Sequence, residues 1–336
     1  MVIVVHSCEF FYGGSEGHLG IRSATDGFWV SLIDSLVRSC VPLFVLASAY
    51  LLLPIKGSSR DFFKRRFVRV LVPFIVWSLL YAVLPVCWGG FAVADVRSNF
   101  VQLCTNMLPS ASHLWFVYML IGLYLFMPVL SPWLKSVSKR GEQAFLLVWA
   151  ISTFWHYGNA LVGDLYGEAF WNEFHTLFYF SGFIGYLVLA HYIRTYIDWS
   201  LRKSICIGTA FFIIGYLFTA IPFYHLTVVA GTLYELELSW RFCSPNVAMM
   251  TFGIFIMMKH IRLGSGVVYS IVRRISQLSY GMYLMHIFIL NLSYYLLHGY
   301  FSTPVTIALV AVSTFAATAI AARLLSLLPK SKYIVG

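Results

Sequence analysis

Apolar stretches alternate with short polar segments along the whole chain. A hydrocarbon core about 30 Å thick needs about 20 predominantly apolar residues in each helix that crosses it. The pattern therefore predicts an all-α, polytopic membrane protein built as a helical bundle. We expect nine complete spans, at residues 28–53, 70–88, 113–130, 143–160, 174–191, 204–222, 243–258, 277–298 and 303–325.

The first twelve residues, MVIVVHSCEFFY, form a further apolar segment. About ten apolar residues are too few to cross a bilayer. We therefore expect this segment to be the end of a helix whose beginning lies upstream of Met1. Counting this truncated first helix, the pattern predicts about ten transmembrane helices in a single integral-membrane domain over residues 1–336.

Composition agrees with a membrane protein and excludes a nucleic-acid-binding one. Charged residues make up only 11% of the chain, whereas a soluble domain carries about 25%. The net charge is +10, but most of the 23 Lys and Arg residues lie in short loops between apolar spans, so no single basic face is available for nucleic acid. The six cysteines have no spacing typical of a metal site or a disulfide framework, and we expect no metal.

Every second loop is basic, and the loops between them carry most of the acidic residues. Cytoplasmic loops of membrane proteins are enriched in Lys and Arg. The alternation therefore predicts that both termini are cytoplasmic, and it supports an even number of spans. Trp and Tyr residues near span ends, among them Trp155 and Trp240, fit the aromatic belts of the two membrane interfaces.

Polar side chains inside apolar spans are costly, so they are candidates for function. His6 and Glu9 lie three residues apart in the first segment and share a helix face. A neutral imidazole beside a carboxylate can accept a proton from a hydroxyl group, which predicts a catalytic base and a polarising acid. The alternative is a histidine at a helix end that faces lipid headgroups.

His286 lies near the middle of the predicted span 277–298, with Tyr283 on the same helix face. The pair could contact a substrate, or His286 could form a structural hydrogen bond between helices. The segment SHLWF places His113 and Trp115 at the outer start of another span, where an aromatic ring suits stacking on a sugar. The alternative is an interfacial anchor. Weaker candidates at other outer mouths are Glu173, His175, Glu235 and Glu237.

The basic run FFKRRFVRV carries Arg65, Arg66 and Arg69 into the span 70–88. Arg66 and Arg69 point the same way, and guanidinium forks suit the phosphates of coenzyme A. The alternative is a topology signal or a contact with anionic membrane lipids. In the preceding span, the i, i+4 spacing of Asp34 and Arg38 predicts an ion pair within the membrane.

Five segments, taken together and in order, resemble the integral-membrane acyltransferase 3 family. They are VVHSCEF, SCVPLFVLASAYLLLP, FFKRRFVRVLVPFIVWSLLY, HLWFVYMLIGLYLFMPVL and SYGMYLMHIFIL. His6 matches the histidine of the family's first helix, and Arg66 and Arg69 match its Arg-x-x-Arg pair. The family's basic residue ten positions before the histidine would fall before Met1, so the resemblance implies either a start upstream or an inactive copy.

The resemblance implies a bacterial inner-membrane enzyme that O-acetylates a surface glycan or lipid-linked sugar. Acetyl-coenzyme A would be the cytoplasmic donor, with acetyl or another acyl group transferred. His6 would then be the base, and the arginines would hold the donor's phosphates. Two other classes stay open: a carrier or flippase for a lipid-linked sugar, whose intramembrane charges would mark a transport path, and an inactive membrane partner of glycan assembly.

Overall fold

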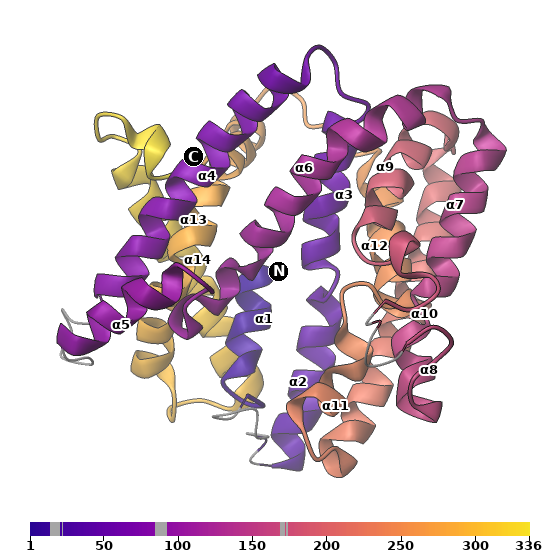
Figure 1. Cartoon of the computed structure of the whole chain (residues 1–336). Coiled ribbons are helices and arrows are strands. Elements are labelled where there is room, and N and C mark those ends of the chain that lie inside the picture. The colour runs from indigo at the N-terminus through magenta and orange to yellow at the C-terminus, as the bar shows by residue number, and fades with distance from the viewer. Residues whose placement is uncertain (14–20, 22, 85–92, 169–171, 173) are drawn as a thin grey trace. The chain divides into compact units, whose positions relative to one another are not determined.

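The computed structural model describes residues 1–13, 21, 23–84, 93–168, 172 and 174–336, which fold into helices joined by short turns (Figure 1). The prediction of an all-α fold is confirmed for this part of the chain. Within it, seven helical segments are long and apolar enough to cross a membrane. The chain is therefore a multi-pass membrane protein, whereas the predicted number of ten spans stays a prediction.

The helices group into two compact units. Unit 1 comprises Met1–Lys56, Met127–Arg262 and Ser302–Ile307, and unit 2 comprises Gly57–Phe126, Leu263–Phe301 and Ala308–Gly336. The helices of unit 1 are α1 (Val2–Glu9), α2 (Ala24–Val37), α3 (Cys40–Leu52), α7 (Lys139–Ser152), α8 (Trp155–Val162), η4 (Phe178–Phe180), α9 (Ile184–Tyr196), α10 (Leu201–Val229), α11 (Leu233–Leu236), η5 (Glu237–Trp240) and α12 (Pro245–Met258). Those of unit 2 are α4 (Ser59–Val83), α5 (Val93–Leu103), η3 (Pro109–Leu114), α13 (Val267–Leu297) and η6 (Ser331–Tyr333). Two helices, α6 (Trp115–Ser136) and α14 (Thr303–Leu325), contribute residues to both units. The expected single domain over the whole chain stays a prediction.

The predicted span 28–53 is two helices, α2 and α3, with a break at Arg38 and Ser39. Proline has no N–H to donate to the carbonyl four residues earlier, and its ring clashes with that carbonyl. The carbonyl four residues before Pro42 belongs to Arg38. Pro42 in the first turn of α3 therefore accounts for the break, and the break leaves the Arg38 side chain at the junction of the two helices.

The predicted span 174–191 is wrong in its first half. Residues 174–183 form turns and the short η4, and α9 begins at Ile184. Gly182 has a φ of 71°, which is incompatible with a helix, and its carbonyl accepts a hydrogen bond from Trp149 Nε1 at 2.9 Å. The aromatic run before it is as apolar as a span, which explains the error. The end of the predicted span 70–88 lies outside the described residues.

The closest helix packing in unit 1 is between α10 and α12. A Cβ atom added at Gly208 would lie 2.7 Å from the carbonyl oxygen of Gly253, and one at Gly253 would lie 2.4 Å from that of Gly208. Gly215 similarly faces the carbonyl oxygen of Asn246. Small residues let two membrane helices approach to backbone contact, so these glycines set the spacing of the pair.

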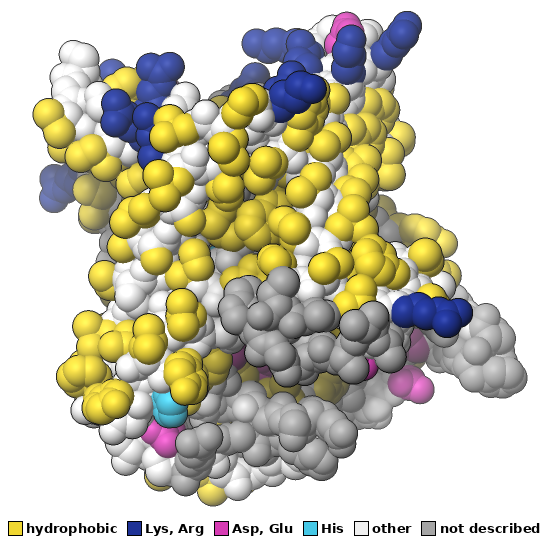
Figure 2. Space-filling model, turned by 90° about the vertical axis from the view of Figure 1, so that its left-hand side faces the viewer, with side chains coloured by type: hydrophobic (Ala, Val, Ile, Leu, Met, Phe, Trp, Pro, Cys, Tyr) yellow, Lys and Arg dark blue, Asp and Glu magenta, His cyan; other side chains and the backbone are white. Residues whose placement is uncertain are grey.

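Basic side chains meet at one end of the unit 1 helices. Arg194 donates from Nη1 to the carbonyls of Tyr50 and Leu53 at 3.0 and 2.8 Å, at the end of α3. Lys259, just after α12, donates to the carbonyls of Ile193 and Ile197 at the end of α9. Cations at helix C-termini satisfy carbonyls that have no partner within the helix. On another side of the molecule, Figure 2 shows most, though not all, of the Lys and Arg side chains of the face that it draws near one end.

Candidate functional site

His6 and Glu9 form the only predicted catalytic pair, and the structure brings their side chains into contact. Both lie on α1, and the Nδ1 atom of His6 is 2.8 Å from Oε2 of Glu9. In the tautomer with hydrogen on Nδ1, the ring donates to the carboxylate and leaves Nε2 as the basic nitrogen. The His6 side chain is 16% exposed and that of Glu9 44%, so the imidazole is mostly covered while the carboxylate is partly open. Its catalytic role stays a prediction.

A buried ion pair lies in the helix against which α1 packs. Arg38 Nη1 is 3.3 Å from Oδ1 of Asp34, and both side chains are buried. This confirms the ion pair that the i, i+4 spacing predicts. His6 lies within electrostatic range of both groups, and Glu9 within range of Arg38. The four side chains therefore form one charged cluster inside unit 1.

Trp240 holds Arg38 in place from a distant part of the chain. Arg38 Nε donates to the carbonyl of Trp240 at 2.9 Å, and the guanidinium carbon lies 4.9 Å from the ring centroids of Trp240 and Phe242. Trp240 Nε1 donates to Oγ of Ser35 at 2.9 Å, and its ring stacks on Phe223. Trp240 is completely buried, so the expectation that it anchors the protein at the membrane interface is wrong. Its ring packs instead against the buried guanidinium of Arg38.

Tyr12, in the turn that follows α1, packs beside the same charged cluster. The hydroxyl of Tyr12 donates to Oε1 of Glu237 at 2.9 Å, and Tyr12 makes edge contacts with Phe223 and Trp240. The sequence indicated Glu237 only as a weak candidate at an outer mouth. It gave no signal that Tyr12 and Glu237 would meet, because 225 positions separate them.

The predicted substrate-binding residues His113, Tyr283 and His286 meet in unit 2. The rings of His113 and His286 are 5.0 Å apart and nearly perpendicular, and His113 lies 5.8 Å from Tyr283. His286 Nδ1 donates to the carbonyl of Tyr283 at 2.5 Å, and the Tyr283 hydroxyl donates to the carbonyl of His113. The sequence predicted each residue but not that η3 and α13 bring them together.

His113 is buried, with 3% of its surface exposed, so it does not lie open at an outer mouth as expected. Tyr81 of α4 covers it at 5.2 Å and stacks on Phe288 at 4.1 Å. No motif marks Tyr81 as part of this cluster, so sequence reasoning missed it. Trp115 is half-buried at the start of α6, and its ring is 6.3 Å from that of Phe116.

The predicted donor-binding arginines lie on the first half of α4 in unit 2. Arg65 and Arg69 are exposed and Arg66 is half-buried. The Nε atom of Arg66 is buried and has no hydrogen-bond partner among the residues that the structure describes. The helix therefore presents guanidinium donors that an anion can use.

His175 has a structural environment. Its ring stacks on Trp155 at 4.3 Å, and its Nδ1 accepts a hydrogen bond from the backbone N–H of Leu177. Burial lowers the pKa of His175, and the charge of nearby Glu168 offsets this only in part. The ring is therefore neutral at pH 7 and serves as packing. Glu173 lies outside the described residues.

The predicted site residues belong to two different units of the chain. His6 and Glu9 belong to unit 1, whereas the arginines and the aromatic and histidine cluster belong to unit 2. Contact between the two groups stays a prediction. In the described part of the chain, no three His, Cys, Asp or Glu side chains are placed to hold a metal ion. The chemistry open to these residues is proton transfer at His6 and anion binding along α4.

Comparison with protein families identifies a match over most of the chain. The family model Acyl_transf_3, described as an acyltransferase domain, matches residues 1–323 and thus nearly the whole chain. Comparisons with curated proteins and with solved structures give no match.

Proposed function

Because the chain belongs to the acyltransferase 3 family, we propose that it is a membrane-bound O-acyltransferase of the bacterial inner membrane. It moves an acetyl group, or another acyl group, from cytoplasmic acyl-coenzyme A to an envelope polysaccharide or a lipid-linked sugar. The observation that carries the proposal is the 2.8 Å contact between His6 and Glu9 beside the buried charges of unit 1. A histidine held by a carboxylate can act as the general base that activates a sugar hydroxyl.

The proposed reaction is a direct transfer. His6 Nε2 takes the proton of the acceptor hydroxyl as the oxygen attacks the thioester carbonyl carbon. Glu9, hydrogen-bonded to Nδ1, stabilises the imidazolium that forms. The carbon–sulfur bond then breaks, and the departing thiolate takes the proton from the imidazolium. The products are the O-acyl sugar and free coenzyme A.

The arginines of α4 support a phosphate-bearing donor. Arg66 has a buried guanidinium nitrogen without a hydrogen-bond partner in the described part of the chain. Arg69 lies three residues further along the helix and is exposed. Guanidinium groups spaced in this way can hold the phosphates of coenzyme A. Arg65 adds positive charge beside them.

The cluster of unit 2 supports a sugar acceptor. His113, Tyr283 and His286 form a packed group of rings with hydrogen-bonding edges. Trp115 follows η3 directly and is partly exposed. Aromatic rings offer an apolar face, and imidazole and phenol edges offer hydrogen bonds, which together suit a ring-shaped polyol.

Release of free thiol from acetyl-coenzyme A by the purified full chain tests the proposal, with isolated envelope glycans as acceptors. His6→Gln should lower the rate by about 10²–10⁴-fold, the usual contribution of general base catalysis. Glu9→Gln should lower it less, because the hydrogen bond to Nδ1 survives without the charge. His225→Gln is the matched control, since His225 is exposed on α10 of the same unit.

Two results would overturn the proposal. Transfer that survives in His6→Gln removes His6 as the base. Movement of a lipid-linked sugar across liposomes, without thiol release for any acceptor, identifies a carrier instead.

A further inference from the structure

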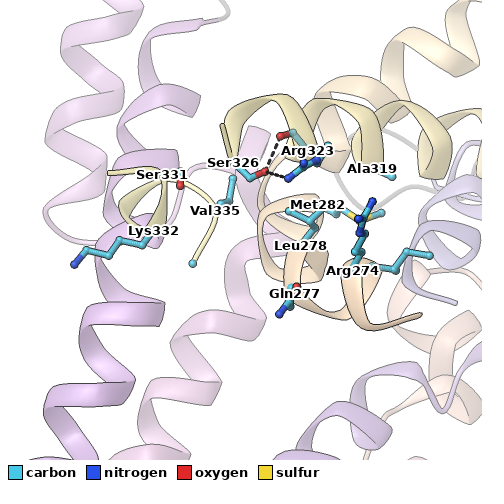
Figure 3. Close-up of a pocket in the computed structure, with 12 residues that line it drawn as sticks. Arg274, Gln277, Leu278, Met282, Ala319, Arg323, Ser326, Ser331, Lys332 and Val335 are labelled. Atoms are coloured by element: carbon cyan, nitrogen blue, oxygen red, sulfur yellow. Dashed lines mark hydrogen bonds between the residues drawn. The ribbon is translucent and has the colours of Figure 1, made fainter. Parts of the chain in front are cut away.

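A pocket of about 450 Å³ lies in unit 2 between α13, α14 and the C-terminal segment 331–336 (Figure 3). Leu278, Met282 and Val335 form apolar parts of its wall, and Gln277 provides a hydrogen-bonding group. The Ser326 hydroxyl accepts a hydrogen bond from Nη1 of Arg323 at 3.4 Å and donates to the Arg323 carbonyl (Figure 3). None of the predicted catalytic, donor-binding or substrate-binding residues belongs to this lining. The pocket is therefore a candidate binding site that the proposed acyl transfer does not use.

Two arginines give the pocket its charge. Figure 3 shows Arg274 of α13 and Arg323 of α14 on the same side of the pocket, and Lys332 extending away from it. The lining contains no acidic side chain. Among the ion pairs of the described residues, none involves either arginine. Two guanidinium groups facing one pocket repel each other unless an anion lies between them, and phosphate is the anion that their planar forks suit.

The wall opposite the arginines is held in place by packing. Trp77 Nε1 of α4 donates to the carbonyl of Ile334 at 2.9 Å. Val335 is buried and packs closely against α13. A Cβ atom added at Gly281 would lie only 2.8 Å from the Cβ atom of Val335. The segment 331–336 is thus fixed on two helices, and the pocket is formed before any ligand binds.

Apolar side chains continue from the pocket along α14 toward the membrane interior. Ile320 and Val312, three and eleven residues before Arg323 on the same helix face, are large and exposed. In a membrane such side chains contact acyl chains, while neighbouring arginines extend to the headgroup level. A nucleotide phosphate would leave this apolar surface uncovered, whereas a phospholipid would cover it with its own chains.

We propose that the pocket binds the phosphate of an anionic phospholipid headgroup between Arg274 and Arg323, with the lipid's acyl chains along the exposed Ile320 and Val312 of α14. Basic pockets between transmembrane helices bind such headgroups. The inference rests on this pocket alone and stands or falls independently of the acyl-transfer proposal. The shared chemistry is a phosphate group, which the nucleotide part of coenzyme A could also supply, so the test separates the two sources.

The test uses the purified full chain in nanodiscs of phosphatidylcholine with a small fraction of phosphatidylglycerol, and counts retained phosphatidylglycerol by native mass spectrometry. Arg274→Gln with Arg323→Gln should lower its retention about tenfold or more, because each basic residue near the membrane contributes about 1 kcal/mol. Arg273→Gln with Lys330→Gln is the matched control, since it removes the same charge from positions that do not line the pocket. It should change retention by less than about twofold.

Ala319→Phe keeps both arginines and fills the pocket from α14, so it should also lower retention. Equal retention in the pocket and control variants would overturn the inference in favour of general surface attraction. Displacement of phosphatidylglycerol by adenosine 3′,5′-bisphosphate, lost in the Arg274→Gln, Arg323→Gln variant, would overturn the lipid source in favour of a nucleotide. Size-exclusion profiles of all variants confirm folding.

Discussion

Arg38 joins several buried side chains of unit 1 that come from distant parts of the chain. It pairs with Asp34, donates to the carbonyl of Trp240 and lies against the rings of Trp240 and Phe242. A charge far from water persists only when a partner and hydrogen bonds replace its hydration. The arrangement satisfies this condition and places a fixed cation within electrostatic range of Glu9, which ties the candidate base to the core of the unit.

Removing the cation alone should destabilise the protein strongly. Arg38→Met leaves the Asp34 carboxylate buried without compensation, which costs about 3–5 kcal/mol of the free energy of unfolding. Asp34→Asn combined with Arg38→Met removes both charges and should recover a large part of that loss. Thermal unfolding in detergent, followed for both single variants and the double variant, measures the coupling energy. A double variant whose loss of stability equals the sum of the losses in the Arg38→Met and Asp34→Asn single variants would show that the pair is not coupled.

At the level of elements, the sequence predicted local contacts well and distant ones poorly. The spacing of His6 with Glu9, and of Asp34 with Arg38, predicted contacts that the structure confirms. Such pairs need only the helical period, which apolar patterning supplies. The contact of Arg38 with Trp240 spans 202 positions and depends on how helices pack, so no local pattern predicts it.

Backbone details were missed where a single residue outweighs hydrophobicity. The span 28–53 is confirmed as one membrane-crossing segment, Ala24–Leu52, but Pro42 breaks its helix in two. Gly182 lies just before α9, and the first half of the span 174–191 is not α-helical. In both places the surrounding residues are as apolar as in an uninterrupted helix. The backbone geometry of proline and glycine determines where these helices break or begin, and a count of hydrophobic residues does not include it. The joining of His113 with His286 was missed for a related reason, because it depends on the packing of η3 on α13.

Arg194 and Lys259 donate hydrogen bonds to backbone carbonyls near the ends of α3 and α9. The role of Arg194 can be tested by substitution. Arg194→Ala removes two hydrogen bonds to the carbonyls of Tyr50 and Leu53. The free energy of unfolding should fall by about 1–2 kcal/mol, because these bonds have a charged donor and are partly exposed. Arg202→Ala is the control, since Arg202 is exposed at the start of α10. Equal thermal stability of the two variants would contradict a capping role for Arg194.

At the scale of the whole molecule, alternation of loop charge is the property that sets orientation. In unit 1, Arg194 and Lys259 come from two different basic loops, yet they cap helix ends that lie together. Lys139, from a third basic loop, lies over the ring of Tyr196 at 5.5 Å. Three loops that the charge pattern assigned to one side therefore meet at one end of the unit, as a membrane protein inserted by the positive-inside rule requires.

Labelling of single cysteines in intact cells tests the predicted cytoplasmic side. With the six native cysteines replaced by serine or alanine, a cysteine is introduced in a basic loop by Gly264→Cys or in an acidic loop by Asp164→Cys; both positions are exposed. A membrane-impermeant maleimide should label the Asp164→Cys protein and leave the Gly264→Cys protein unlabelled until the membrane is broken. The reverse pattern would show that the basic loops lie outside the cytoplasm, opposite to the predicted orientation. The arginines of α4 would then face away from cytoplasmic coenzyme A, and the proposed donor route would be lost even with His6 and Glu9 in contact.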